Sequence, residues 1–443
     1  MDPLAIAGIM LVLLVFFIFL GIYVGVSLAF LSFAGLWWIS GNVEVAIRLL
    51  GTTSFAAIMD YVFGVIPFFV AMGLLSNVSG ASGDLYTAFG LLTRRIRGGL
   101  GVATVFSNAV FAAITGVSVA SAAVFSKISL PEMLKAGYEK KFALGVVAGS
   151  SVLGMLIPPS VLFVIYGVIS EQAIGRLFMA GVLPGLVLTA VYSFGIYIMV
   201  SRRPRLIMSQ EALDGRKTWE KIGMGQFVRA FFNCWGVVLL IIVTLGSIWF
   251  GFCTPTEAGA VGAFGALVLG LGKRQMNLPK FWRVLMDTGI TTSGIFFLLI
   301  AAQMYSRMLA ISGLAQWSSE WVISLQVSPI VIILMFLLIF FIMGCFIDSV
   351  SIMLLTLPLM LPIVQKLGYD LIWFGIVSTV VIEMGLVTPP FGMVVFAMKA
   401  ALGEEARIEE IFQGSYPFLF MLIVTIAILI FFPGLSTWLP SLM

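Results

Sequence analysis

The sequence contains no histidine and only three cysteines among its 443 residues. Histidine is the commonest proton relay, zinc ligand and general base, so its absence disfavours haem, zinc and histidine-triad enzymes. Cys234, Cys253 and Cys345 stand apart in apolar stretches, which is neither a disulfide framework nor the spacing of a metal site. Charged residues make up only 10% of the chain, against about a quarter of a soluble protein. The chain therefore lacks the polar surface of a soluble enzyme.

Hydrophobic residues make up 61% of the chain, which predicts an integral membrane protein with lipid as its solvent. At about 20 apolar residues per span, the length allows roughly ten to fourteen membrane segments and no large soluble domain. The net charge of +4 is a weak signal for nucleic acid, and no nucleic-acid partner is expected. No P-loop sequence occurs, so the chain does not use ATP through such a loop.

Basic residues cluster in four segments, 94–97, 135–141, 202–229 and 273–283. Lysine and arginine accumulate in short cytoplasmic loops, so we place all four clusters inside and the N-terminus outside. Asp2 stands where a signal peptide would be basic, and we expect the first helix to remain. The expected spans lie at 4–20, 22–39, 61–79, 142–170, 178–200, 235–250 and 256–271.

The segment 98–125 is flanked by two of these basic clusters and is interrupted by Thr115-Gly116-Val117-Ser118. It is too long for one span and too short for two spans of about 20 residues each. We predict a re-entrant helical hairpin that enters and leaves on the cytoplasmic side. Irregular backbone at membrane depth is tolerated only beside protein or a water-filled cavity, so the hairpin tip marks a site.

The two halves of the chain align at an offset of about 230 residues. Segment 154–159 then falls on 385–390, and 115–118 falls on 348–351. Five crossings per half make the second copy inverted, and inverted repeats with paired broken helices indicate a secondary transporter. The predicted first repeat is 1–230, with a surface helix at 43–58, a hairpin at 98–125, a broken helix at 142–170 and a cytoplasmic connecting segment at 201–230. The predicted second repeat is 231–443, with a surface helix at 277–290, a hairpin at 328–362 and a broken helix at 371–400.

The paired breaks and tips supply oxygen atoms and neither nitrogen nor sulfur ligands. Each Pro-Pro pair removes backbone donors and frees carbonyl groups, and oxygen ligands suit alkali cations, so Na⁺ is the expected coupling ion. Asp348 and Glu383 are ionisable groups at membrane depth, and either can carry a proton instead. The predicted first sodium site comprises Thr115, Gly116, Ser118, Ser121, Gly154, Ile157 and Pro158. The predicted second sodium site comprises Asp348, Ser349, Ser351, Gly385, Thr388 and Pro389. The residues expected to contact substrate are Ser118, Ser160, Ser351 and Pro390.

The segment Thr254-Pro255-Thr256-Glu257 has the composition of an active site but the spacing of a helix start. Threonine at the N-cap, proline at N1 and glutamate at N3 form a capping box. We therefore expect these residues to begin a span and not to carry chemistry.

The sequence segments described above, together with several others given below, resemble the large membrane subunit of tripartite ATP-independent periplasmic (TRAP) transporters. The resemblance covers essentially the whole chain. The first tip departs from the family's usual Ser-Gly-Ser-Ser in having Thr115 and Val117. The segments that carry the resemblance are 66–69, 115–121, 131–133 with 137–138, 157–160, 177–185, 254–258 and 388–392.

The resemblance implies an elevator-type symporter, driven by sodium, in the cytoplasmic membrane of a bacterium or archaeon. It also implies a small four-helix membrane subunit and an extracytoplasmic substrate-binding protein as partners, in addition to membrane lipid. The substrate would be a small organic anion such as a carboxylate, sialic acid or a sulfonate. A stand-alone sodium- or proton-coupled carboxylate carrier of the same architecture is the alternative. An intramembrane enzyme is a more distant one, because no nucleophile and base stand at catalytic spacing.

Overall fold

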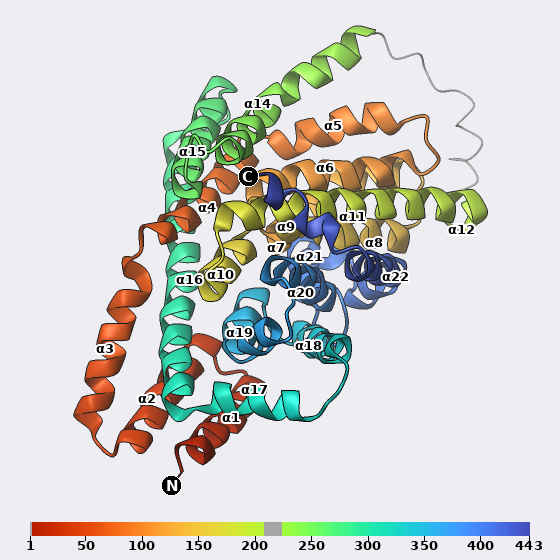
Figure 1. The fold of residues 1–443 in the computed structure, drawn as a ribbon. Helices are drawn as coiled ribbons and strands as arrows, with labels where there is room; N and C mark the ends of the chain where they lie inside the picture. The colour runs from red at the N-terminus through yellow and green to blue at the C-terminus, as the bar shows by residue number, and fades with distance from the viewer. Residues whose placement is uncertain (1, 208–223) are drawn as a thin grey trace.

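The computed structural model describes residues 2–207 and 224–443, and it is built from helices (Figure 1). By length and composition, seven helices of the described chain can cross a membrane, or eight if one bent pair counts as a span. Helices are expected here, because a backbone in lipid must satisfy its N–H and C=O groups within its own segment. The chain is thus an all-helical, multi-pass membrane protein, which confirms the fold class predicted from composition.

The first half runs from the N-terminus to the described end of the connecting segment. Residues 208–223 of the predicted connecting segment 201–230 lie outside the described residues. The elements of this half are α1 (Pro3–Phe19), α2 (Val24–Ser40), α3 (Val43–Met59), the 3-10 helix η1 (Tyr61–Gly64), α4 (Val65–Val78), α5 (Ala81–Thr93), α6 (Gly99–Thr115), α7 (Ser118–Lys135), α8 (Lys140–Ser151), α9 (Leu153–Leu156), α10 (Val161–Ser170), α11 (Ile174–Arg202) and α12 (Pro204–Ile207).

The second half contains a similar succession of elements. A hairpin is again followed by an interrupted helix and a long closing helix. The elements are α14 (Met224–Trp249), α15 (Pro255–Gly272), α16 (Leu278–Ser312), α17 (Leu314–Ser324), α18 (Pro329–Gly344), α19 (Ser349–Lys366), α20 (Leu371–Leu386), α21 (Met393–Leu402), η3 (Gly403–Glu405), α22 (Ile408–Phe431), α23 (Gly434–Thr437) and η4 (Pro440–Leu442).

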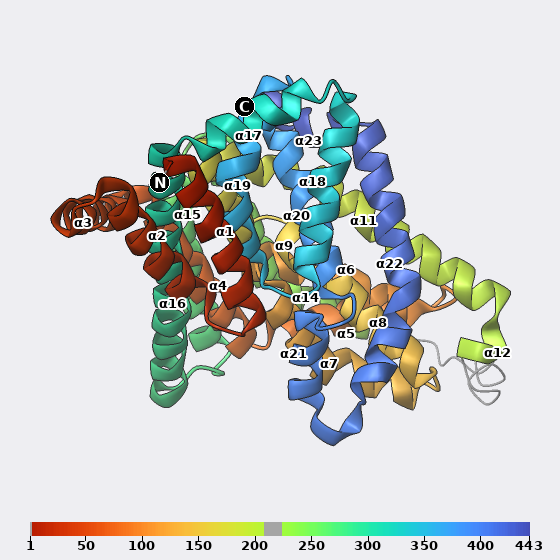
Figure 2. The same cartoon turned by 90° about the horizontal axis from the view of Figure 1, so that it is seen from below.

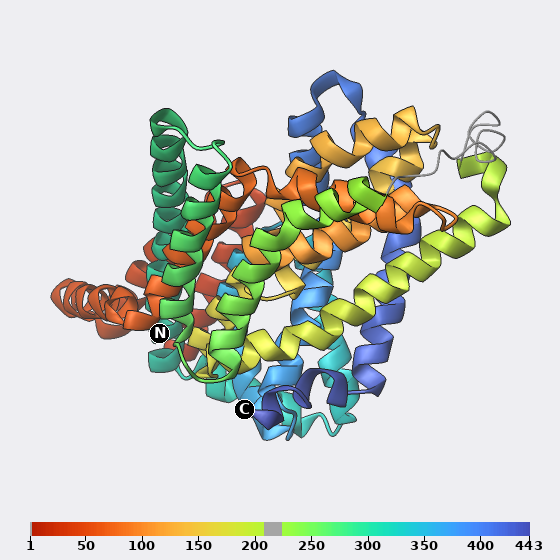
Figure 3. The same ribbon diagram turned by 90° about the horizontal axis from the view of Figure 1, so that it is seen from above.

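The helices pack in two groups, each drawn from both halves of the chain. In the scaffold group, which we define as α1–α4 and α14–α16, α4 packs against α15 and α16, and α2 packs against α16. In the hairpin group, defined as α6–α11 and α18–α22, α7 packs against α21 and α8 against α22. Figures 2 and 3 show the two groups side by side, with α3 projecting from the scaffold group.

The helix α3 is separate from the span that follows it, whereas its predicted counterpart at 277–290 is not. Asp60 is extended, and its side chain accepts the N–H of Val62 at 3.0 Å, which ends α3 and starts η1. Residues 278–312 instead form one uninterrupted helix of 35 residues. The predicted surface helix at 277–290 is therefore wrong, because no capping side chain breaks the chain there and the helix continues into the span.

The helical hairpins extend beyond their predicted limits. The first continues to Lys135 and the second to Lys366, through Pro131 in α7 and through Pro358 and Pro362 in α19. A proline inside a buried membrane helix is tolerated where neighbouring helices satisfy the freed backbone groups. The predicted interruptions do occur, at 157–160 between α9 and α10 and at 387–392 between α20 and α21.

The helices α8 and α22 cross at glycines. A Cβ atom on Gly145 would overlap the carbonyl oxygen of Gly414, and one on Gly414 would overlap the carbonyl of Lys141. At the same end, Lys140 pairs with Glu410 at 2.7 Å. This contact joins the two halves of the chain inside the hairpin group.

The predicted capping box is confirmed. The Thr254 Oγ1 accepts the N–H of Glu257 at 3.3 Å, and Glu257 accepts the N–H of Thr254 at 2.8 Å, which starts α15. The three cysteines are free, as their isolation in the sequence predicts.

Candidate functional site

The first hairpin turns at Gly116, directly against the break between α9 and α10. Gly116 has a φ of +63°, a region that favours glycine, and a Cβ there would overlap the Pro159 carbonyl oxygen. The Gly116 carbonyl accepts the N–H of Val161 at 3.4 Å. A backbone hydrogen bond thus joins the hairpin tip to the helix that follows the break. We call this contact the first junction.

The first junction is closed on its other side by Gly154 and Ser118. A Cβ on Gly154 would lie 2.8 Å from the Ser118 Cα, closer than packed atoms come. The Ser118 and Ser121 side chains are fully buried, and neither hydroxyl has a hydrogen-bond partner among the described residues. Thr115, by contrast, donates to the Phe111 carbonyl at 3.0 Å within its own helix.

The predicted first sodium site is thus gathered only in part. Gly154 contacts Ser118, Gly116 contacts the break at Pro159, and Ser121 lies one turn further along α7. Ile157 begins the break, where its N–H donates to the Leu153 carbonyl at 2.9 Å, and Pro158 follows it. The break also contains the cis peptide Pro158–Pro159.

The second hairpin meets the break between α20 and α21 in the same way. A Cβ on Gly385 would lie 2.6 Å from the carbonyl carbon of Gly344, the last residue of α18. The Cys345 carbonyl accepts the N–H of Phe391 at 3.2 Å, the counterpart of the bond between Gly116 and Val161. We call this contact the second junction. Its break contains the cis peptide Pro389–Pro390.

Some polar side chains at the second junction already make hydrogen bonds, and others do not. Asp348 caps α19, its Oδ1 accepting the N–H of Ser351 at 2.9 Å. Thr388 donates to the Met384 carbonyl at 2.7 Å. The Ser351 side chain is 1% exposed, and its hydroxyl has no partner among the described residues. Pro389 is half-buried in the break. Among the side chains of the second junction, the Ser351 hydroxyl is therefore the clearest oxygen that is available to bind a cation.

Glu383 lies where the two hairpins approach each other. Its side chain is fully buried on α20, and Ser349 of the second hairpin donates to its Oε1 at 2.8 Å. Ser118 of the first hairpin lies close enough to interact with the same carboxyl group, although its hydroxyl makes no hydrogen bond. Within the described parts of the chain the Oε2 atom has no hydrogen-bond partner, and none of the ion pairs there includes Glu383.

A buried carboxylate without a cationic partner is costly at membrane depth, so it needs a bound cation or a proton. The sequence marks Glu383 as an intramembrane acid, but not its position between the hairpins. That position depends on the approach of Ser118, which is more than 200 residues away along the chain, and no local pattern reports it. Glu383 is therefore the residue of this region whose role the sequence reveals least.

The unpartnered atoms are all oxygens, which fits an alkali cation. Hard cations without a strong geometric demand bind hydroxyl, carbonyl and carboxylate oxygens. No group of three or more Asp, Glu or Cys side chains within 2–207 and 224–443 has the arrangement of a transition-metal site. The buried oxygens without a partner at these two junctions belong to Ser118, Ser121, Ser351 and Glu383.

The residues expected to contact substrate are divided between the junctions. Ser160 is buried and caps α10, its hydroxyl accepting the N–H of Phe163 at 3.5 Å. Pro390 is exposed in the second break. Ser118 and Ser351 belong to different hairpins, and Glu383 lies between the two, bonded to Ser349 and close to Ser118. Ser118 and Ser160 thus belong to the first junction, and Ser351 and Pro390 to the second.

Comparison with known proteins gives matches over most of the chain. The family model for the "Tripartite ATP-independent periplasmic transporter, DctM component" matches residues 11–435. The C4-dicarboxylate TRAP transporter large permease protein DctM of Pseudomonas aeruginosa is 32% identical over 402 residues, 89% of this chain and 90% of that protein. The sialic acid TRAP transporter large permease protein SiaM of Vibrio cholerae is 28% identical over 426 residues, 96% of each chain.

One solved structure shows a similar fold at low sequence identity. The YdaH transporter of Alcanivorax borkumensis, described as having an unusual topology, superposes with a TM-score of 0.60 and 16% identity. The match covers 89% of this chain and 88% of that one. It supports the arrangement of helices and carries no information about substrate.

Proposed function

Because the chain belongs to the DctM family of TRAP transporter large permeases, we propose that it takes up an organic acid anion in symport with sodium by an elevator movement. It is a transporter subunit and not an enzyme, as the absence of a catalytic constellation in the sequence predicts. The observation that carries the proposal is the pair of junctions, each with buried oxygen atoms that lack a partner.

The residues that would hold the ions are those whose oxygens face the junctions. Ser118, Ser121 and the carbonyls of 154–158 would serve the first site. Ser349, Ser351 and the carbonyls of 385–389 would serve the second. A sodium ion at each junction would supply the positive charge that the buried oxygens lack. Glu383 would hold the two hairpins in register, because it contacts one serine from each.

The two packing groups support the elevator movement. The hairpin group contains both junctions, so it would move as a unit relative to the scaffold group. The contact between the groups includes Gly73 of α4, where a Cβ would lie 2.9 Å from the Thr115 Cα. A glycine at this place would let the hairpin tip slide past α4 without meeting a side chain. We propose that the two halves are inverted repeats and that the N-terminus lies outside.

The proposed partners are those implied by the family. A small four-helix membrane subunit would extend the scaffold group, and an extracytoplasmic binding protein would deliver the anion. The membrane is proposed to be the cytoplasmic membrane of a bacterium or archaeon. If the partners are required, the chain alone should not accumulate substrate in proteoliposomes.

The test is uptake by the reconstituted complex under imposed gradients. An inward sodium gradient at fixed pH should drive accumulation, and a pH gradient without sodium should not. Accumulation only with the pH gradient would replace sodium by a proton, with Asp348 or Glu383 as its carrier. Uptake by the isolated chain would support the stand-alone carrier instead.

A further inference from the structure

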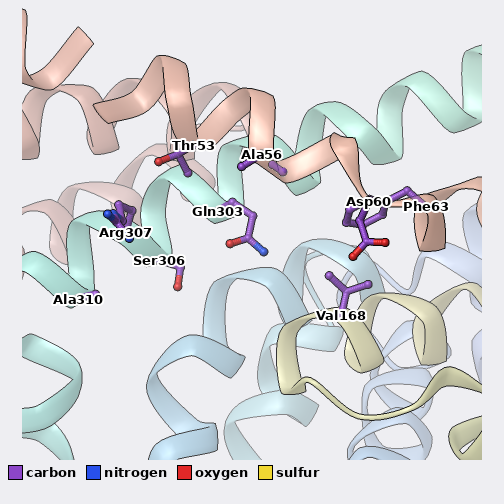
Figure 4. Close-up of a pocket in the computed structure, with 10 residues that line it drawn as sticks. Thr53, Ala56, Asp60, Phe63, Val168, Gln303, Ser306, Arg307 and Ala310 are labelled. Carbon is purple, nitrogen blue, oxygen red and sulfur yellow. The ribbon is translucent and has the colours of Figure 1, made fainter. Parts of the chain in front are cut away.

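A cavity of about 450 Å³ lies between the scaffold group and the hairpin group, apart from both junctions (Figure 4). Its walls are one face of α3 and one face of α16, and Val168 of α10 closes a third side. The facing residues include Ala56, Ala57 and Ala310, whose small side chains leave the space open. The volume falls in the range of small-molecule sites, roughly 300 to 1,000 Å³.

The cavity has opposite charges at its two ends. Figure 4 shows Arg307 near Thr53 at one end, Asp60 at the other, and the Gln303 amide between them. Thr53 lies on α3 and Asp60 is the extended residue that ends this helix, so about 10 Å separates the two along the chain and the cavity is about 10 Å long. It can therefore hold a molecule of several carbon atoms whose two ends differ in charge or polarity.

Arg307 is exposed at the edge of the cavity, near the end of α16. It is about 7.5 Å from the end of α16 at Ser312, on the helix end opposite the basic cluster 273–283. An ionisable residue within a membrane helix usually faces a cavity and pairs with an opposite charge. No ion pair between described residues includes Arg307. A guanidinium group binds carboxylates and similar anions through two parallel hydrogen bonds.

Asp60 would determine which functional groups the ligand can have at the end away from Arg307. A carboxylate repels a second anion but accepts hydrogen bonds from hydroxyl or amide groups. One of its oxygens already accepts the N–H of Val62, which fixes the side chain. The pair therefore fits an organic anion with its acid group at Arg307 and a hydroxyl-bearing body toward Asp60.

The cavity is also linked to the proposed transport path. Val168 lies eight residues beyond Ser160 on α10, or about 12 Å along the helix. An outward shift of the hairpin group by that distance would bring the first junction level with the cavity. We propose that this cavity is a vestibule that receives the organic anion on the outer side, before it reaches the hairpins. This inference rests on the proposed function.

The vestibule can be tested without measuring transport. Ser306→Cys, in a chain with Cys234, Cys253 and Cys345 replaced by Ala, places one thiol in the cavity wall. The full complex in phosphatidylcholine vesicles is treated with anionic sulfonatoethyl or cationic trimethylammonioethyl methanethiosulfonate. Arg307→Gln should lower the ratio of anionic to cationic labelling rates by roughly ten-fold, because a unit charge a few ångströms away acts on both reagents with opposite sign.

Two further variants keep this test falsifiable if Arg307→Gln folds poorly. Arg307→Lys retains the charge and should keep the ratio, and Arg283→Gln removes a charge from the same helix outside the cavity and should not change it. An unchanged ratio in folded Arg307→Gln would overturn the proposal. So would an equal fall in Arg283→Gln.

Ligand chemistry is tested by protection of the same thiol. Gluconate should slow labelling from outside, and sorbitol, the same polyol without a carboxylate, should not. Arg307→Gln should abolish the protection by gluconate. Asp60→Asn should bring the protection by gluconate closer to the protection by propionate, a carboxylate without hydroxyl groups. Equal protection by gluconate and sorbitol, or none by either, would overturn the proposal.

A phospholipid headgroup carries similar anionic chemistry and must be separated from a free anion. If a lipid occupies the cavity, added phosphatidylglycerol should slow anionic labelling and gluconate should fail to protect, which would overturn the proposal. Protection by gluconate in both lipid compositions supports it. Protection of the thiol by gluconate needs no sodium gradient. If gluconate still protects but a sodium gradient fails to drive uptake, the sodium-coupling proposal is rejected and the vestibule proposal is not.

Discussion

Replacing Gly154 by alanine should separate the first hairpin from its broken helix. The added Cβ would lie 2.8 Å from the Ser118 Cα and 2.9 Å from its backbone N, and neither backbone atom can move without displacing the tip. Overpacking of this kind costs about 1 to 3 kcal/mol. If the cost falls on the closed junction, the sodium concentration for half-maximal uptake should rise roughly five-fold to a hundred-fold.

The assay is sodium-dependent uptake by the reconstituted complex, together with thermal unfolding of the purified chain with and without sodium. Gly289→Ala is the matched control, because a Cβ there meets no atom within 4 Å. It should leave the sodium dependence unchanged. A normal sodium dependence in folded Gly154→Ala would refute the contribution of the first junction to ion binding.

Ser118→Ala and Ser351→Ala should each raise the half-saturating sodium concentration several-fold, since each removes one unpartnered buried oxygen. Binding of ²²Na⁺ measures this concentration. An unchanged affinity in both variants would argue against ligation by these serines. Ser349→Ala removes the hydrogen bond to the Glu383 carboxyl and should destabilise the chain by about 1.5 to 3 kcal/mol, seen as a lower thermal midpoint, whereas an unchanged midpoint would mean that this bond is not formed. Gly145→Ala should weaken the crossing of α8 and α22 by about 1 to 3 kcal/mol and lower the yield of monodisperse protein, with Gly8→Ala as the unaffected control.

The sequence predicts the hairpin helices and four of the seven expected spans because their signals are local, whereas the expected spans at 4–20 and 22–39 are apolar helices of only 17 residues. The described chain has seven or eight candidate spans, fewer than the ten to fourteen membrane segments that its length allows. Apolar length, the Thr115 to Ser118 interruption and the two Pro-Pro pairs each act within a few residues. The capping box at Thr254 is another such case, since its hydrogen bonds are confined to one turn. These features required no knowledge of neighbouring helices.

The remaining features depend on contacts between distant segments. The division of 43–58 from the following span rests on one capping aspartate, Asp60, and the halves differ there in a way that their alignment conceals. The short helices α5 and α17 are not distinguished by the sequence pattern. Glu383 and Arg307 are visible as charges in apolar segments, but part of their surroundings comes from the first half of the chain: Ser118 lies near Glu383, and α3 and Val168 line the cavity at Arg307.

The number of sodium ions bound by the purified chain tests the central claim most directly. Equilibrium ²²Na⁺ binding should give two ions per chain, and Ser118→Ala and Ser351→Ala should each weaken a different one. Binding of two ions with this separation is the predicted result. No saturable sodium binding, or one ion that both variants weaken equally, would contradict the assignment of one ion to each junction.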